Sequence, residues 1–176
     1  MEPEIIIRPF QEQDQKNVAN LIIGIQRDEF GIDISLNDQP DLSDIWQFYQ
    51  SRQGNFWCAV NSYDEIVGTI ALIDIEDRIG VIRKMFVRKD YRGIETRVAK
   101  DLLDVLENWA QKKRFTRLYL GTVDKLRAAQ KFYRKNDYTL IDPSLLPPNF
   151  PRMVVDNLFF VKTLPVHFGG DSGLLR

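Results

Sequence analysis

One stretch of the chain, residues 79–138, constrains the fold most because strand patterns and helix patterns alternate along it. The patterns are, in order, a strand at 79–87, a polar turn with a glycine at 88–93, a helix beginning near residue 99, a strand at 118–123 and a second helix carrying Phe132 and Tyr133. Strands that alternate with amphipathic helices in this way predict a sheet with helices packed against it.

The residues before this stretch add a meander of strands and two helices. Expected elements are a strand at 5–7, a helix capped by Asp14 and broken by Gly31, a short helix capped by Ser43 and ended by Gly54, and strands at 56–60 and 66–75 joined as an antiparallel hairpin. The sequence therefore predicts an α/β fold (mixed α+β), with a twisted, mostly antiparallel central sheet and helices on both faces. We expect one domain at 1–164 and a C-terminal tail at 165–176.

Composition narrows the classes of function. The chain has 176 residues and a formal net charge of −1, so we expect no nucleic-acid partner and no membrane partner. The acidic start of the chain does not look like a signal peptide, and the expected location is cytoplasmic. The single cysteine, Cys58, lies in an apolar run and is expected to be a buried, inert thiol. No Cys/His cluster has metal-ligand spacing, so no metal site is expected.

The turn at 88–93 and the helix that follows it together form a candidate anion site. The first N–H groups of a helix have no internal partner and lie at the positive end of its dipole. Gly93 allows the backbone conformations of a tight anion-binding loop. The basic residues around this helix start are Arg83, Lys84, Arg88, Lys89, Arg92, Arg97 and Lys100. They are either a solvated surface or the rim of an anion site, and the helix start favours the rim.

A set of positions in and around this stretch resembles one known family. The positions are Val87, Tyr91, Arg92, Gly93, Arg97, Val98, Ala99, Leu102, Leu103, Leu120, Gly121, Thr122, Ala129, Phe132, Tyr133, Lys135 and Asn136. In this order they resemble the core of the GNAT N-acetyltransferase superfamily. Residues 5–9 are similar to the opening strand of that family, and 149–156 to a closing segment of a bacterial branch.

The resemblance implies an enzyme that moves an acetyl group from acetyl-CoA to a primary amine of a small molecule or peptide, by direct transfer in a ternary complex. It implies acetyl-CoA contacts at Met85, Phe86, Val87, Arg92, Gly93, Arg97, Val98, Ala99, Lys100, Thr122, Ala129 and Phe132. Tyr133 is the expected general acid, which protonates the departing CoA thiolate. The edge of the strand at 85–87 would pair with amides of the pantetheine arm, and one of its N–H groups could polarise the thioester carbonyl.

The sequence departs from the family pattern at three positions. Arg97 stands where a glycine is usual, and it either adds charge beside the pyrophosphate or crowds the loop. Leu126 replaces an asparagine that could contact the pantetheine arm. Asp137 stands where glycine commonly ends the helix, although Asn136 tolerates the left-handed conformation found there.

The sequence does not single out one general base or one acceptor site. Candidate bases are Asp28, Glu29, Asp74 and Glu76, each of which is otherwise a plain surface carboxylate, while His167 is assigned to the tail. The acceptor is expected to lie against residues 28–46 and 143–152. The second segment is a substrate wall or a contact in a homodimer, and the aromatic residues at 46, 48 and 49 either line the acceptor cleft or simply pack in the core.

Two other functions remain open. The replacement at Arg97 and the missing base are compatible with a non-catalytic CoA-binding sensor or interaction module on the same fold. A dinucleotide-binding protein is remote because the chain has no Gly-x-Gly-x-x-Gly turn.

Overall fold

One seven-stranded sheet organises the structure, a computed structural model that describes residues 4–93 and 95–166. Its strands are β1 (Ile6–Pro9), β2 (Asn55–Val60), β3 (Ile66–Asp74), β4 (Ile79–Val87), β5 (Arg117–Thr122), β6 (Thr139–Ile141) and β7 (Leu158–Thr163). They lie in the order β1-β2-β3-β4-β5-β7-β6, and every neighbouring pair is antiparallel except β4 and β5. The predicted mostly antiparallel sheet is confirmed.

Four α-helices and several short helical turns connect the strands. The α-helices are α1 (Gln15–Gly24), α2 (Pro40–Ser43), α3 (Val98–Lys112) and α4 (Arg127–Lys135). Two π-helical turns, η2 (Ile25–Glu29) and η4 (Trp46–Gln50), follow α1 and α2, and short 3-10 turns are η1 (Glu12–Asp14), η3 (Leu36–Asp38), η5 (Lys89–Tyr91) and η6 (Pro143–Leu145). No helix in the described ranges is long and apolar enough to cross a membrane.

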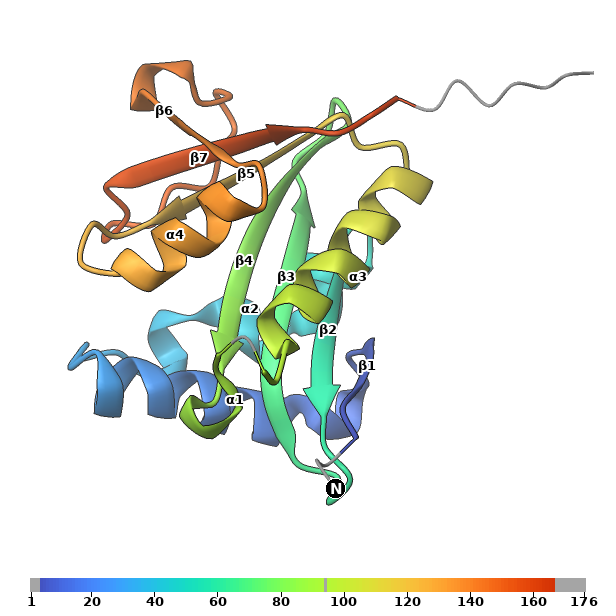
Figure 1. Cartoon of the computed structure of the whole chain (residues 1–176), viewed down its shortest axis with the longest axis vertical. Helices are drawn as coiled ribbons and strands as arrows, with labels where there is room; N and C mark the ends of the chain where they lie inside the picture. Colours follow the sequence, from blue (N-terminus) through green and yellow to red (C-terminus); the bar gives the residue numbers. More distant parts are fainter. Residues whose placement is uncertain (1–3, 94, 167–176) are drawn as a thin grey trace, which may run out of the picture.

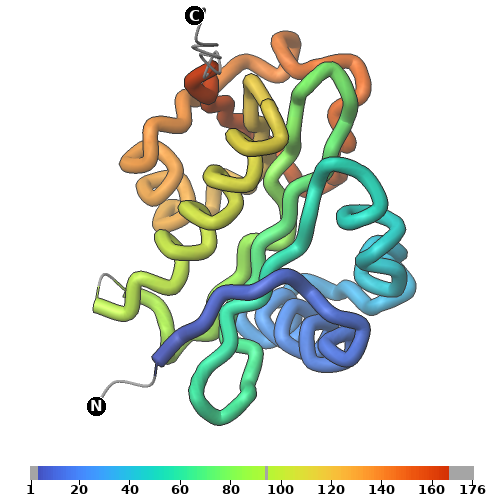
Figure 2. The backbone as a smooth tube through the Cα atoms, turned by 90° about the vertical axis from the view of Figure 1, so that its right-hand side faces the viewer, coloured from blue at the N-terminus to red at the C-terminus, as the bar shows by residue number. Residues whose placement is uncertain are grey.

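The helices cover both faces of the sheet, as predicted. Figure 2 shows α3 and α4 on one side of the strands and α1 with α2 on the other. Leu102, Leu103 and Leu106 of α3 are fully buried in one apolar core, against the sheet. Ile22 and Leu42, from α1 and α2, are fully buried in a second core on the opposite face. We call these sides the α3 face and the α1 face.

The parallel pair β4 and β5 is joined along only part of its length. Pairing runs from Ile79 opposite Arg117 to Val81 opposite Tyr119, and β4 continues to Val87 without a partner on that side. Beyond the paired residues, β5 and β7 turn away from β2, β3 and β4 (Figure 1). The sheet therefore opens between the second half of β4 and the end of β5, and we call this gap the β4–β5 opening.

A β-bulge bends β4 within the opening. The register with β3 shifts between Thr69 and Ala71, and Lys84 takes a left-handed backbone with φ of 52°. The Thr69 hydroxyl donates a hydrogen bond of 2.7 Å to the Lys84 carbonyl. Because a bulge re-aims the residues beside it, Lys84 projects to the α1 face and Met85 packs against the core of the α3 face.

Asp14 is the N-cap residue of α1 as predicted but its side chain does not cap that helix, and the cap expected at Ser43 is wrong. The Asp14 carboxylate precedes α1 but caps η1 instead, where it accepts the Gln11 N–H at 2.9 Å and pairs with Arg8 at 2.6 Å. Ser43 is the last residue of α2, and the turn at η4 is capped by Asp44, which accepts the Gln47 N–H at 3.1 Å. In both cases a neighbouring short turn competes for the polar side chain.

Candidate functional site

The start of α3 presents backbone donors that no side chain satisfies. In the described part of the loop, no side chain caps this helix, so the N–H groups of Val98, Ala99 and Lys100 face outward from its first turn. Arg97 precedes them in a left-handed conformation with φ of 53°, and Gly93 has φ of 113°. Such a helix start attracts an anion through its N–H groups and its dipole.

The left-handed backbone explains why a glycine is usual at position 97. Glycine adopts positive φ without cost, whereas other L-residues are strained there by roughly 1–2 kcal/mol. The Arg97 side chain turns outward along the helix, with its Nε 3.8 Å from Asp101. It therefore does not crowd the loop, and its charge remains near the helix start.

The cations that were expected to form the anion rim are mostly paired with carboxylates. The pairs are Arg88 with Glu65 and Asp90, Arg92 with Glu29, Arg97 with Asp101, and Lys100 with Asp104. Lys84 was also expected at the rim, and this is wrong, because its side chain is buried on the α1 face. The backbone N–H groups are therefore the main attraction for an anion at this site.

Arg92 is held by two partners. Its Nε donates to the Val87 carbonyl at 2.7 Å, and its two terminal nitrogens lie 2.7 and 2.9 Å from the Glu29 carboxylate. This side chain ties the loop before α3 to η2 and the end of β4. Since Glu29 is engaged in this pair, it is a poor candidate for the general base.

The α3 face of the β4–β5 opening is apolar. Met85, Ala129 and Phe132 are partly buried against its core, and Val87 and Tyr133 belong to the core itself. Thr122, at the end of β5, is also buried. Phe86 is the exception among the expected cofactor residues, because it packs on the α1 face.

The Tyr133 ring packs against three other aromatic rings. Its ring lies 5.5 Å from Phe132, 5.7 Å from Tyr138 and 6.2 Å from Phe160, centroid to centroid. Its hydroxyl makes no hydrogen bond with any residue of the described ranges, whereas the hydroxyl of Tyr138 donates to Glu107 at 3.0 Å. Burial raises the pKa of Tyr133 above its usual value, so the hydroxyl keeps its proton and is available as a donor.

The α1 face of the opening carries a buried polar network centred on Lys84. Its Nζ lies 2.7 Å from the Gln39 amide oxygen and 3.4 Å from Asp41, and the Tyr49 hydroxyl donates to the same carboxylate at 2.5 Å. Gln39 in turn exchanges two amide hydrogen bonds with Gln26. Burial lowers the pKa of Lys84 and raises that of Tyr49. The network fixes η2, α2 and η4 to the β4 bulge.

Asp156 and Arg83 are two further polar side chains on this face. Asp156 lies against Gly121 of β5, where an added Cβ would meet its Oδ2 at 2.4 Å. The Arg83 guanidinium lies 3.0 Å from the Met153 sulfur. The sequence placed Arg83 in the candidate anion rim, which is wrong because its guanidinium lies on the α1 face. The sequence assigned Asp156 no role, although a glycine inside a strand is a signal for close approach by another group.

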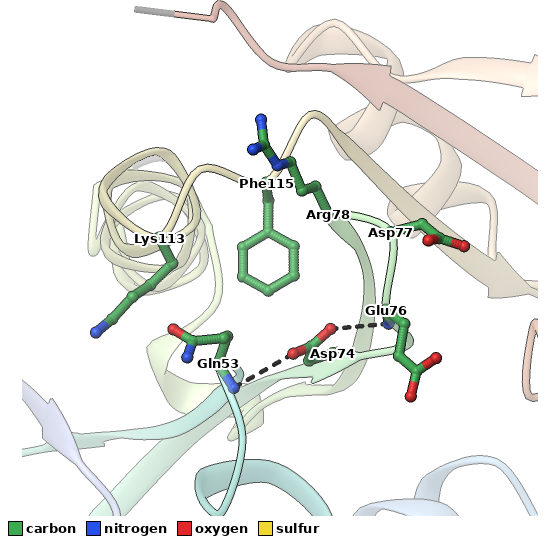
Figure 3. A pocket seen from close by; sticks show the side chains of 7 residues that line it. All are labelled: Gln53, Asp74, Glu76, Asp77, Arg78, Lys113 and Phe115. Atoms are coloured by element: carbon green, nitrogen blue, oxygen red, sulfur yellow. Dashed lines mark hydrogen bonds between the residues drawn. The ribbon is translucent and has the colours of Figure 1, made fainter. Parts of the chain in front are cut away.

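Two of the expected bases lie at the far end of the sheet. Asp74 and Glu76 border a hollow at the β3–β4 turn, which is also lined by Gln53, Asp77, Arg78, Lys113 and Phe115 (Figure 3). The Asp74 carboxylate accepts the Glu76 N–H at 2.8 Å. The hollow adjoins the first residue of β4 and the C-terminal end of α3, whereas the opening lies along the second half of β4. His167 lies outside the described residues.

The expected acceptor segments divide into buried and exposed parts. Tyr49 is core, but Trp46 and Phe48 on the same turn are 55% and 45% exposed. In the segment 143–152, the Phe150 ring lies 5.7 Å from the Phe159 ring, centroid to centroid. The Arg152 guanidinium lies over the same Phe159 ring, 4.9 Å from its centroid. This segment forms a wall on the α1 face, beside the end of β5.

Comparisons with known proteins agree with this geometry. The model of the acetyltransferase (GNAT) family matches residues 22–138. An acetyltransferase of the GNAT family from Staphylococcus aureus Mu50 is 36% identical with a TM-score of 0.87, over 92% of this chain and 100% of that one.

Two curated relatives come from Xenopus tropicalis. Probable N-acetyltransferase 14 is 31% identical over 119 residues, which are 67% of this chain and 57% of that protein. N-acetylaspartate synthetase is 30% identical over 126 residues, 69% of this chain and 45% of that protein. The chain thus spans about half the length of the curated relatives it matches. With fold, helix start and sequence in agreement, the chain belongs to the GNAT acetyltransferase family.

Proposed function

We propose that this protein transfers an acetyl group from acetyl-CoA to a primary amine, directly and in a ternary complex. One observation carries the proposal: the only parallel strand pair of the described sheet opens beside an uncapped helix start. That geometry places an anion-attracting helix start near an unpaired strand edge, which matches a ligand with a pyrophosphate and an amide-containing arm. Membership of the family gives the same activity as its expectation.

The cosubstrate fits from the α3 face. The pyrophosphate would accept hydrogen bonds from the N–H groups of Val98, Ala99 and Lys100, with the charge of Arg97 nearby. The pantetheine arm would run along the unpaired edge of β4 at 85–87, where strand N–H and C=O groups can pair with its amides. The thioester then lies in the β4–β5 opening, and the amine reaches it from the α1 face.

In this arrangement each proton has a route. The amine nitrogen forms a bond to the thioester carbonyl carbon, and the C–S bond breaks as CoA leaves. The Tyr133 hydroxyl gives its proton to the sulfur, which suits a hydroxyl that has no hydrogen-bond partner among the described residues and whose pKa is raised by burial of the ring. A proton lost by the new amide nitrogen then restores Tyr133.

A non-catalytic CoA-binding module is the second candidate, favoured by the paired cations around α3. The test is calorimetric titration with acetyl-CoA together with an assay of CoA release over a panel of amines. For Tyr133→Phe we expect kcat to fall roughly 100-fold or more, with the Kd for acetyl-CoA nearly unchanged. Tyr138→Phe is the matched control, because its hydroxyl bonds to Glu107 instead. Tight binding without turnover by any amine would establish the second candidate, and no binding would exclude both.

A further inference from the structure

Two opposite charges lie on the α1 face beside the β4–β5 opening. The parallel pairing ends with Val81 opposite Tyr119, and Arg83 and Gly121 each lie two residues further along their own strands. Val81 and Tyr119 both belong to an apolar cluster on the α1 face, so by strand alternation position 83 and position 121 point the same way. Asp156 occupies the space above Gly121. A guanidinium and a carboxylate therefore flank the place where the amine must enter.

Neither charge is neutralised by an ion pair. Within residues 4–93 and 95–166, no carboxylate lies within 4.0 Å of Arg83, and no cation lies that close to Asp156. The only polar contact of the Arg83 guanidinium in these ranges is with the Met153 sulfur, a weak acceptor. Burial raises the pKa of Asp156, although a backbone hydrogen bond at Met153 and the nearby charges of Arg83, Arg152 and Lys84 oppose that shift.

Other buried or partly buried charges near the opening do form ion pairs. Lys162 and Glu107 close to 2.9 Å between β7 and α3, and Lys84 pairs with Asp41 at 3.4 Å in the network below the opening. A partly buried charge without a partner is costly, and such groups gather where a ligand supplies the partner. Arg83 and Asp156 influence each other electrostatically but do not close to within the 4.0 Å of an ion pair.

We propose that the acceptor is an amine that also carries a carboxylate, with its ammonium held by Asp156 and its carboxylate by Arg83. This inference rests on the proposed function. An amino acid or a short amino-carboxylate has this pair of charges within a few bonds. A polyamine fits poorly, because Arg83, Arg152 and Lys84 put more positive than negative charge around the entrance.

Asp156 also completes the proton balance. The acceptor nitrogen enters as an ammonium and ends as an amide N–H, so it loses two protons. Asp156 takes the first and releases it to solvent, which frees the nitrogen lone pair for attack on the thioester carbonyl. The second proton returns to Tyr133 after the Tyr133 hydroxyl has protonated the CoA sulfur. A carboxylate with a raised pKa is better suited to accept a proton than an ordinary exposed one.

The substrate class is tested with matched amines. A series of amino acids with one to five methylenes between amine and carboxylate is compared with the corresponding carboxamides and with simple monoamines and diamines. We expect kcat/KM for one or more acids to exceed that of the matching amide by roughly 10- to 100-fold. Arg83→Gln should remove this preference, chiefly through KM. Equal use of acids and amides, or a preference that survives Arg83→Gln, overturns the inference while leaving acetyl transfer established.

The role of Asp156 is tested by moving its carboxylate while keeping the residue itself unchanged. In Gly121→Ala the new Cβ displaces the Asp156 carboxylate, the movable end of a side chain. We expect kcat to fall about tenfold or more, with acetyl-CoA binding and the preference for acids retained. Gly24→Ala is the matched control, since nothing lies within 4 Å of a Cβ added there. Unchanged kcat in Gly121→Ala overturns the role of Asp156.

A second readout covers the case of no turnover. The CoA-bound protein is titrated calorimetrically with the same acids and amides, using the wild type and Arg83→Gln. We expect acids to bind the wild type more tightly than amides do, and Arg83→Gln to lose the difference. If acids show no advantage in this binding either, the inference is overturned. If CoA itself does not bind, the proposed function fails first.

Discussion

The two faces of the β4–β5 opening differ in how they present polarity. On the α3 face the side chains are apolar or aromatic, and the polar groups offered to a ligand are backbone N–H groups at the start of α3. On the α1 face the polar groups are side chains, namely Lys84, Asp41, Arg83 and Asp156. Backbone donors are present whatever the sequence, whereas side chains change with each substitution. The α3 face therefore suits a ligand that stays the same when side chains change, as proposed for acetyl-CoA. The α1 face suits a ligand that is chosen by particular side chains, as proposed for the acceptor amine.

The largest effect should come from Asp156→Asn. The variant cannot accept the ammonium proton, so we expect kcat/KM to fall by about 10²–10⁴-fold at neutral pH. The wild-type pH profile should lose activity as pH falls through the raised pKa of Asp156, and the variant should lack that limb. Steady-state rates over a range of pH give both results. An unchanged profile would show that the α1 face does not supply the base.

The same substitution should stabilise the fold. Because the folded pKa of Asp156 lies above the unfolded value, the folded protein binds more protons between the two values, and stability falls as pH rises through that window. Above the raised pKa the wild type carries this penalty and Asp156→Asn does not. We expect a higher Tm for the variant at pH 7 and a smaller difference at pH 4, measured by thermal unfolding. A lower Tm at pH 7 would contradict this account of the site.

Lys84→Met should have the next largest effect, and mainly on stability. It leaves Asp41 buried without its cation, at a cost of about 3 kcal/mol or roughly 6–12 °C in Tm. Lys162→Met is the control, since it breaks the pair with Glu107 on the α3 face. Both variants should unfold at lower temperature, but only Lys84→Met should also change the KM of the acceptor. If both variants changed the KM of the acceptor equally, the α1 face would have no special role in binding the acceptor.

Arg97→Gly should have a small effect, confined to the cosubstrate. Glycine relieves the left-handed strain at φ 53°, but it also adds unfolded-state freedom worth about 0.5–1 kcal/mol, so stability should change little. Loss of an exposed charge should weaken acetyl-CoA binding about two- to threefold at low salt, and less at high salt. Calorimetry at two ionic strengths measures this. Tighter binding by the variant would show that arginine obstructs the loop.

The smallest effect is expected at Cys58, in the core of the α1 face. The predicted buried thiol is confirmed, and burial raises its pKa to about 12. Treatment of the native protein with iodoacetamide at pH 8 should leave Cys58 unmodified, as checked by mass spectrometry, with denatured protein as the positive control. Labelling of the native protein would mean that the α1 face opens more readily than its packing indicates.

Local patterns were enough to predict most of the fold. The stripe of apolar residues on α3 and the hairpin of β2 and β3 follow from periodicity, and both are confirmed. The helix start was predicted for the same reason, since it depends on local sequence alone. The expected helix caps failed where two short turns lie side by side, because each polar side chain had more than one local partner.

The side chains around the opening were harder to predict because distant segments decide them. Arg92 looked free in the sequence, but its partner Glu29 comes from η2. Lys84 looked like part of a basic surface, but the bulge turns it into the core beside Asp41. Asp156 acquires its place from Gly121, and that contact requires the closing strand pair to be formed.

The short seam between β4 and β5 has a consequence for how such a protein can change. In the proposed function the cosubstrate binds where β4 and β5 part after Val81 and Tyr119, so its site follows from the chain topology. Substitutions at positions 83, 121 and 156 would then change the choice of amine without rebuilding the proposed CoA site. The strand topology thereby separates the site proposed for the cosubstrate from the side chains proposed to select the acceptor.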